Sequence, residues 1–357
     1  MATNDIAAAA PRLFLSNEVH RCWDTEETTY WVLTQMNLDK ARKRENERIR
    51  PYKDTVSGQV EFYKISAGVK QPTAGSAIDP GDDLPAFAAE NLWKDALFPI
   101  RTYVETVTFP GLNIDMNLPA RDNEVSVAVV ARRMEEHSIN QHQTISSKLW
   151  AAAQGAKDVA TLDTQILDTG AIFNIDPAAA GGTEALWAAR VYDHAAKRLL
   201  LNQIANYFRR ARGEKGARLR VAFVGTTLYG MLVEENNAGT YRMLDVQRFF
   251  NYTPKLDGPE PPEIQPIETS LEGIIVGNVL ILPDSRQEVT FPDELFALST
   301  DRIGIKAHGK NNPRTKGPMD VSLPSGKDQT RAAIYRSVVA WMSDRSKQVR
   351  VQNIKIS

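Results

Sequence analysis

The segment from Arg121 to Gly155 repeats apolar side chains at steps of three and four over an unusually long stretch, which predicts one long helix. Asp122 or Asn123 can accept from the free N–H groups of the first turn, and Gly155 is expected to end the helix in a left-handed conformation. The centre of the segment, 137–144, is polar. A helix that is apolar at both ends and polar between them is expected to act as a strut that touches several bodies. The repeat consists of Val127, Val130, Met134, Ser138, Gln141, Ile145, Leu149 and Ala152.

The composition is that of an ordinary globular protein. The chain has 357 residues, of which 42% are hydrophobic and 24% charged, enough for two or more domains or one elaborated domain. The formal net charge is −1, so the overall field does not steer the protein to DNA or to an anionic membrane. No apolar run approaches the ~20 residues of a membrane span. The first residues lack the pattern of a signal peptide, so we expect an intracellular origin.

Cysteine and histidine offer little metal or redox chemistry. Cys22 is the single cysteine, which excludes an intramolecular disulfide and a thiolate zinc site. None of the five histidines stands in an HExxH spacing. His137 and His142 lie five residues apart and off a common helical face, so we interpret them as solvated or interface polar residues rather than as metal ligands.

Other candidate sites are equally incomplete. The segment 223–230 is the nearest to a phosphate loop, but it lacks the lysine and the glycine spacing of that motif. Arg209, Arg210 and Arg212 can contact phosphate, although compensation of a helix dipole is the simpler interpretation. The chain has no GxSxG nucleophile motif. The adjacent acids of each acidic pair point apart, at 82–83, 135–136 and 234–235. We therefore assign no catalytic, cofactor-binding or metal-binding residue, and expect neither an enzyme nor a cofactor.

The rest of the chain alternates short regular patterns with loops. Residues 1–58 do not resemble a compact domain. Their charged run, 41–50, is expected to be a solvated helix face, or part of an arm whose aromatic side chains dock on a neighbouring subunit. Strands are expected at 60–65, 97–109, 218–225 and 349–356, a strand pair at 271–282 around Gly277-Asn278, and helices at 183–212, ended by Gly213, and at 226–232. Residues 332–342 mix helix and strand character.

The order of these parts resembles the major capsid protein of tailed double-stranded DNA bacteriophages, whose fold encapsulin-type shell proteins share. The resemblance implies an α+β fold with an N-terminal arm, an extended β-hairpin loop, a peripheral domain with a long spine helix, and an axial domain with a central sheet. In this sequence the arm is expected at 1–58 and the loop at 59–110. The peripheral domain is expected at 111–200 and 320–357, and the axial domain at 201–319.

The same resemblance implies a structural function. Copies of the chain would assemble into hexamers and pentamers of an icosahedral head, latched by arm and loop, that encloses double-stranded DNA without sequence-specific binding. Portal, scaffolding and decoration proteins are the expected partners. The expected location is the virion, assembled in the bacterial host cytoplasm without a membrane. Two alternatives are an encapsulin-like nanocompartment shell and a two-domain enzyme whose site is assembled from distant residues.

Overall fold

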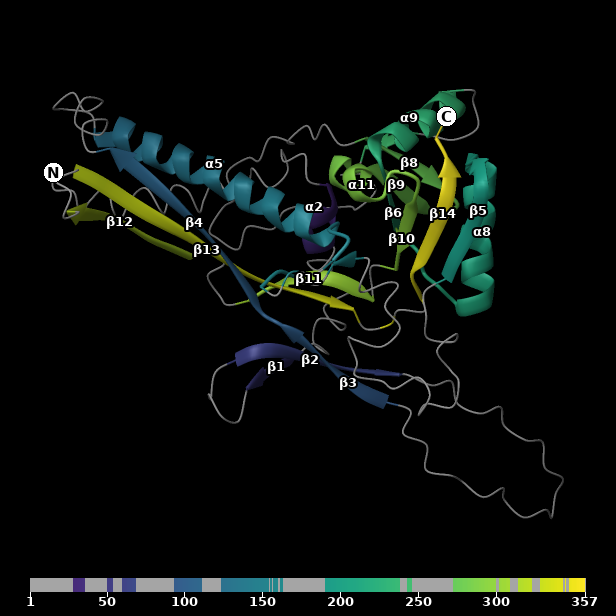
Figure 1. The fold of residues 1–357 in the computed structure, drawn as a ribbon, viewed down its shortest axis with the longest axis horizontal. Coiled ribbons are helices and arrows are strands. Elements are labelled where there is room, and N and C mark those ends of the chain that lie inside the picture. The colour runs from purple at the N-terminus through teal and green to yellow at the C-terminus, as the bar shows by residue number, and fades with distance from the viewer. Residues whose placement is uncertain are drawn as a thin grey trace, which may run out of the picture.

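The computed structural model describes residues 28–35, 50–53, 60–68, 93–110, 123–153, 155, 157–159, 161–162, 190–237, 243–245, 272–299, 302–308, 314–322, 328–342, 344 and 347–356. Their strands form three sheets (Figure 1). The elements are α2 (Thr28–Gln35), β1 (Arg50–Lys53), β2 (Val60–Gly68), β3 (Trp93–Pro99), β4 (Arg101–Pro110), α5 (Asn123–Leu149), β5 (Arg190–Arg198), α8 (Leu201–Lys215), β6 (Val221–Val224), α9 (Thr226–Asn237), β7 (Met243–Asp245), β8 (Glu272–Val276), β9 (Val279–Pro283), α11 (Ser285–Thr290), β10 (Leu295–Leu298), β11 (Ile303–Ala307), β12 (Arg314–Ser322), β13 (Asp328–Met342) and β14 (Val349–Lys355).

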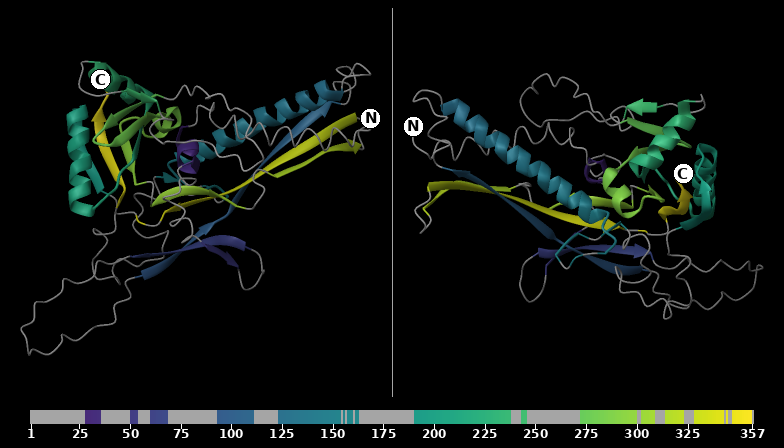
Figure 2. Two further views of the ribbon diagram at one scale, coloured as in Figure 1. Left: turned by 180° about the vertical axis from the view of Figure 1, so that it is seen from behind. Right: turned by 45° about the horizontal axis from the view of Figure 1, so that its top comes forward.

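The predicted long helix is present as α5, which spans 27 residues. It lies along a four-stranded antiparallel sheet in which β13 pairs with β11 and β12 on one side and with β4 on the other (Figure 2). The helix ends earlier than predicted. Leu149 is its last residue, and Gly155 does not adopt the left-handed conformation. The reason is that Trp150, fully buried, turns into the core directly after the helix.

The largest sheet has seven strands in the order β5-β14-β10-β6-β9-β8-β7. Its central strand β6 is buried on both faces, so that it reads as an unbroken apolar run. Val221 and Phe223 face a core that includes the end of α5 and residues of β11 and β13. Ala222 and Val224 face a second core beneath α8 and α9. This sheet therefore separates two hydrophobic cores, one of which it shares with the four-stranded sheet.

The hairpin and the terminal strand are confirmed, and the helix predicted at 183–212 is wrong over residues 190–198, while 183–189 lie outside the described residues. Gly277 and Asn278 both have positive φ, 57° and 67°, as a two-residue hairpin turn requires. Residues 190–198 form β5, because they pair in parallel with β14. The helix spans Leu201–Lys215 and is capped by Gly216 (φ 61°) rather than by Gly213.

Strand pairing also shows which sheet contains β14, a detail that the predicted domains do not give. It lies between β5 and β10 in the seven-stranded sheet, not in the sheet of β13. Arg350 of β14 donates to Glu294 from a buried position, with Nη2 2.7 Å from Oε1. Its guanidinium carbon lies 4.9 Å from the centre of the Phe296 ring. These contacts hold β14 against the start of β10. The division into arm, loop, peripheral domain and axial domain stays a prediction.

The third sheet has the order β1-β2-β3 and lies apart from the other two in the view of Figure 1. The strand predicted at 60–65 is confirmed by β2. The strand predicted at 97–109 is divided at Ile100, so that β3 pairs with β2 while β4 pairs with β13. One continuous stretch thus links two sheets. Among the helices that the structure describes, none combines the length and apolarity needed to cross a membrane.

Candidate assembly surface

Part of the polar centre of α5 packs against its own chain, while Asn140 and Thr144 within it are exposed. Gln141 is buried and donates from Nε2 to the carbonyl oxygens of Ile334 (2.7 Å) and Tyr103 (3.3 Å). Ser138 accepts from Nη2 of Arg336 at 2.8 Å. The polar side chains therefore bond groups of β4 and β13, the paired strands beneath the helix, and a buried polar group is retained because it has a partner.

The two histidines of α5 take different partners. His137 Nδ1 lies 3.0 Å from Oε1 of Glu105 on β4. His142 is 4% exposed, and its ring lies 4.9 Å from that of Tyr30 on α2. The interpretation of both as solvated or interface residues is therefore wrong for His142, which is buried within the chain. In the part of the chain that the structure describes, no three His, Cys, Asp or Glu side chains are placed to hold a metal ion.

The segment that follows α5 is hydrogen-bonded to the start of β4. Arg101 Nε donates to the carbonyl of Asp158 (3.1 Å), and the Val159 N–H donates to the hydroxyl of Tyr103 (3.1 Å). Burial, the largest cause, raises the pKa of Tyr103 to about 12, so this hydroxyl stays neutral. Lys148 at the end of α5 pairs with the Asp158 carboxylate at 3.0 Å. The chain thus turns sharply back after the helix.

Helix α2, from the predicted arm, is anchored in the same core. Tyr30, Val32 and Leu33 are buried in the cluster that contains Trp150. Thr29 donates from its backbone N–H (3.2 Å) and its hydroxyl to Oδ2 of Asp284. The interpretation of this part of the arm as a contact between subunits is corrected: α2 packs inside its own chain. The rest of 1–58 lies outside the described residues, apart from β1, which pairs with β2.

Two candidate phosphate contacts from the sequence are engaged by the chain itself. At the start of α9, Glu288 accepts from the Thr227 N–H (3.3 Å) and from the hydroxyls of Thr226 and Thr227. The hydrogen bond from Thr226, then that from Thr227, lowers the pKa of Glu288. A carboxylate of the protein thus occupies the turn that was the nearest to a phosphate loop.

Two of the three arginines at the end of α8 also contact groups of the chain itself. Arg210 pairs with Glu214 at 3.3 Å and lies 5.3 Å from the centre of the Tyr192 ring. Arg212 donates to the carbonyl of Gly277 at 3.5 Å. Arg209 is exposed. These contacts favour the structural interpretation of the cluster. The acidic pairs also diverge: Glu135 is buried and Glu136 exposed, while Glu235 accepts from the first N–H of α8 at 3.1 Å. The pair at 82–83 lies outside the described residues.

The face of the four-stranded sheet opposite α5 presents a band of exposed side chains. The alternation predicted for β4 is present, with Val104 50% exposed and Val107 buried. Strand register places Val104 beside Tyr335, and Thr108 beside the exposed Arg331. We name this band the outer sheet face; its exposed members are Thr102, Val104, Thr106, Thr108 and Arg331. β-branched side chains at the surface of a sheet suit packing against a further protein surface.

Sequence reasoning found this alternation but missed Asp284. An aspartate between a strand and Ser285 is a helix-capping signal, and its Oδ1 does accept from the Arg286 N–H at 2.9 Å. No sequence signal connects it with Thr29, 255 positions away.

No family model matches the chain, and no curated protein matches it. Solved structures do. A chain of the cyanophage A-1(L) capsid matches with a TM-score of 0.53 and 13% identity, covering 86% of this chain and 90% of its own. A structure of Microbacterium phage Oxtober96 has a TM-score of 0.47, 12% identity and coverages of 87% and 90%. The SrpI encapsulin of Synechococcus elongatus has a TM-score of 0.41, 10% identity and coverages of 74% and 77%. Because the cyanophage likeness spans nearly all of both chains, this protein has the α+β fold of tailed-phage major capsid proteins.

Proposed function

We propose that the protein is a structural shell subunit, many copies of which assemble as hexamers and pentamers into an icosahedral head that encloses double-stranded DNA. The observation that carries the proposal is the fold, which the chain shares over 86% of its length with a chain of a cyanophage capsid. The subunit works by packing and performs no catalysis. Its place is the virion, after assembly in the host cytoplasm.

Two features of the described residues support an assembling subunit. The outer sheet face exposes β-branched side chains along β4, a surface that association with another copy buries. The sheet of β1, β2 and β3 lies below the two larger sheets in Figure 1 and contacts β13 through β3, a place that suits an extended loop directed at a neighbour. A shell subunit gains much of its stability from such contacts between copies.

The partners in this proposal are other copies of the chain, together with portal, scaffolding and decoration proteins. The formal net charge of −1 suits a shell that encloses DNA without gripping it, since binding to phosphates grows with basic charge.

Electron microscopy of the purified full-length protein, and of particles from cells that express it, tests the proposal. We expect closed shells of uniform diameter. A protein that sedimentation shows to be monomeric at every concentration, and that yields no particles in cells, contradicts the proposal. Analysis of the particle contents separates it from the nanocompartment alternative, because packaged DNA supports a phage head and a single enriched cargo enzyme contradicts it.

A further inference from the structure

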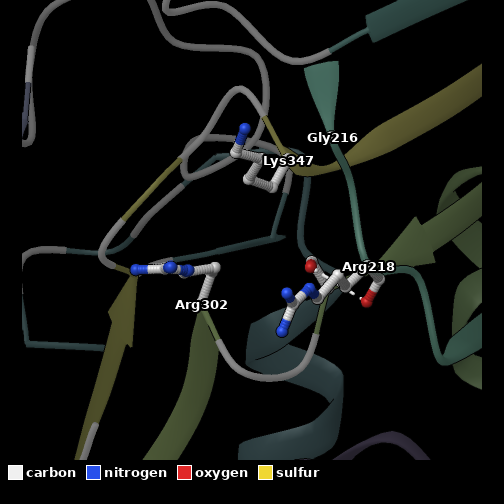
Figure 3. Close-up of a pocket in the computed structure, with 5 residues that line it drawn as sticks. Gly216, Arg218, Arg302 and Lys347 are labelled. Carbon is white, nitrogen blue, oxygen red and sulfur yellow. Dashed lines mark hydrogen bonds between the residues drawn. The ribbon is translucent and has the colours of Figure 1, made fainter. Parts of the chain in front are cut away.

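Three connections of the chain meet beside the junction of the seven-stranded and four-stranded sheets. They are the link from α8 to β6, the link from β10 to β11 and the link from β13 to β14. Between them lies a cavity of about 260 Å³ (Figure 3). Its lining consists of Gly216, Arg218, Ser299, Arg302 and Lys347. Each connection thus contributes one basic side chain to the same cavity.

The lining is strongly one-sided in charge. Three of its five residues are cations, and none of the described lining residues is an acid. Basic side chains that line one concave surface attract an anion to it. An anion in the cavity adds to the contacts that Arg302 and Lys347 already make.

The wall of the cavity is held by hydrogen bonds among the three connections. The Ser299 N–H donates to Oε1 of the buried Gln348 at 2.7 Å, and the Ser299 hydroxyl donates to the carbonyl of Arg218 at 3.0 Å. The Arg302 N–H donates to the Ser299 carbonyl at 2.8 Å. Ser299 therefore joins all three connections and fixes the backbones that carry the basic side chains.

The size and chemistry of the cavity favour a phosphate group. Pockets that hold drug-sized ligands measure about 300–1,000 Å³, so this cavity suits a small anion or one group of a longer chain. Guanidinium groups bind phosphate oxygens with paired N–H donors, and an ammonium adds a point charge. Arg218 and Arg302 supply the former and Lys347 the latter.

We propose that this cavity binds a phosphate group, either free inorganic phosphate or a phosphodiester of a nucleic acid. Arg302 precedes β11 of the four-stranded sheet, while Arg218 and Lys347 precede β6 and β14 of the seven-stranded sheet. A bound phosphate bridges the two sheets and stabilises one arrangement of them. The site is independent of the shell function, because all of its groups come from one chain.

Titration calorimetry of the full-length unassembled protein with inorganic phosphate, at low ionic strength and with chloride as the reference anion, tests the site. The informative variant combines Arg218→Gln with Arg302→Gln. A matched control combines Arg132→Gln with Arg209→Gln, which removes the same charge from exposed positions on α5 and α8. We expect the first variant to weaken phosphate binding by roughly tenfold or more and the control to leave it unchanged. Circular dichroism checks that each variant is folded; if the first is not, Lys347→Gln replaces it.

Equal phosphate binding by the wild type and the cavity variant overturns the proposal, as does a wild type that binds phosphate no better than chloride. A short double-stranded DNA, followed by fluorescence anisotropy, distinguishes the sources. Competition between DNA and phosphate that the cavity variant abolishes identifies the phosphodiester. Phosphate binding that DNA leaves unchanged identifies the free anion.

Discussion

Trp150 donates its indole N–H to the carboxylate of Asp284 across 3.2 Å and thereby joins the end of α5 to the start of α11. The same indole lies 3.0 Å from the hydroxyl of Thr29 on α2. Asp284 is 2% exposed. One buried carboxylate thus connects three elements that are far apart in the sequence, and the relative placement of arm, spine helix and central sheet depends on it.

Asp284→Asn is expected to destabilise the unassembled protein by about 2–4 kcal/mol, because an amide cannot accept from all the N–H and O–H donors that surround the carboxylate. Chemical denaturation followed by tryptophan fluorescence measures the change. Asp293→Asn is the control, since that half-buried carboxylate lies at the other end of α11, in the connection to β10. Equal stabilities of D284N and D293N would show that the hydrogen bonds to Asp284 do not stabilise the fold.

Leu33→Ala is expected to lower the free energy of unfolding by about 2–5 kcal/mol, since it leaves a cavity in the core beside α5. Leu200→Ala, at a position 38% exposed, is the control.

Because α2 fills part of that core, deletion of residues 1–35 should unfold or strongly destabilise the chain, whereas deletion of 1–27 retains α2. Thermal unfolding of the purified variants measures their relative stabilities. A 1–35 deletion as stable as the full chain would contradict the role of α2.

Gln141→Glu is expected to destabilise the protein by roughly 2–3 kcal/mol at pH 7, because it buries a carboxylate against two carbonyl oxygens. The loss should shrink as the pH falls toward 4, where the new carboxyl takes up a proton and can donate. Gln143→Glu, at a half-buried position of the same helix, is the control. Urea denaturation at pH 7 and pH 5 makes the comparison, and a pH-independent loss would argue against the buried carbonyl contacts.

Val104→Lys is expected to block or weaken assembly while changing the stability of the subunit by less than about 0.5 kcal/mol, because the side chain is exposed on the outer sheet face. Val191→Lys, at a position 42% exposed on β5, is the matched control and should assemble normally. Particle yield by electron microscopy and sedimentation is the measurement. Normal shells from V104K would remove the outer sheet face from the interface.

Glu288→Gln is expected to lower the thermal midpoint at neutral pH and to flatten its dependence on pH. The pKa of Glu288 is lowered in the folded state, so its contribution is present above the usual glutamate value of 4.5. That contribution is lost as the pH falls through the lower folded pKa. Midpoints of wild type and variant should therefore converge in acid. A constant difference between pH 7 and pH 3 would contradict the contact with Thr226 and Thr227.

Local patterns predicted much of the fold. The 3.6-residue repeat in α5, the Gly277-Asn278 turn and the alternation along β4 each depend on neighbours in the sequence. The errors share one cause. Residues 190–198 carry the spacing of a helix but form a strand, because β14, more than 150 positions later, supplies their hydrogen-bond partners.

The sequence by itself determined the long helix and its polar centre, because periodicity acts over a few residues, whereas the α+β class was what the family resemblance implied. Only the tertiary structure decided what that centre does. Gln141 donates hydrogen bonds to β4 and β13, and Ser138 accepts one from β13. The indole of Trp150 donates to Asp284, an aspartate 134 positions away. Burial and hydrogen bonding between distant residues depend on how the chain returns on itself, and no local pattern encodes that return.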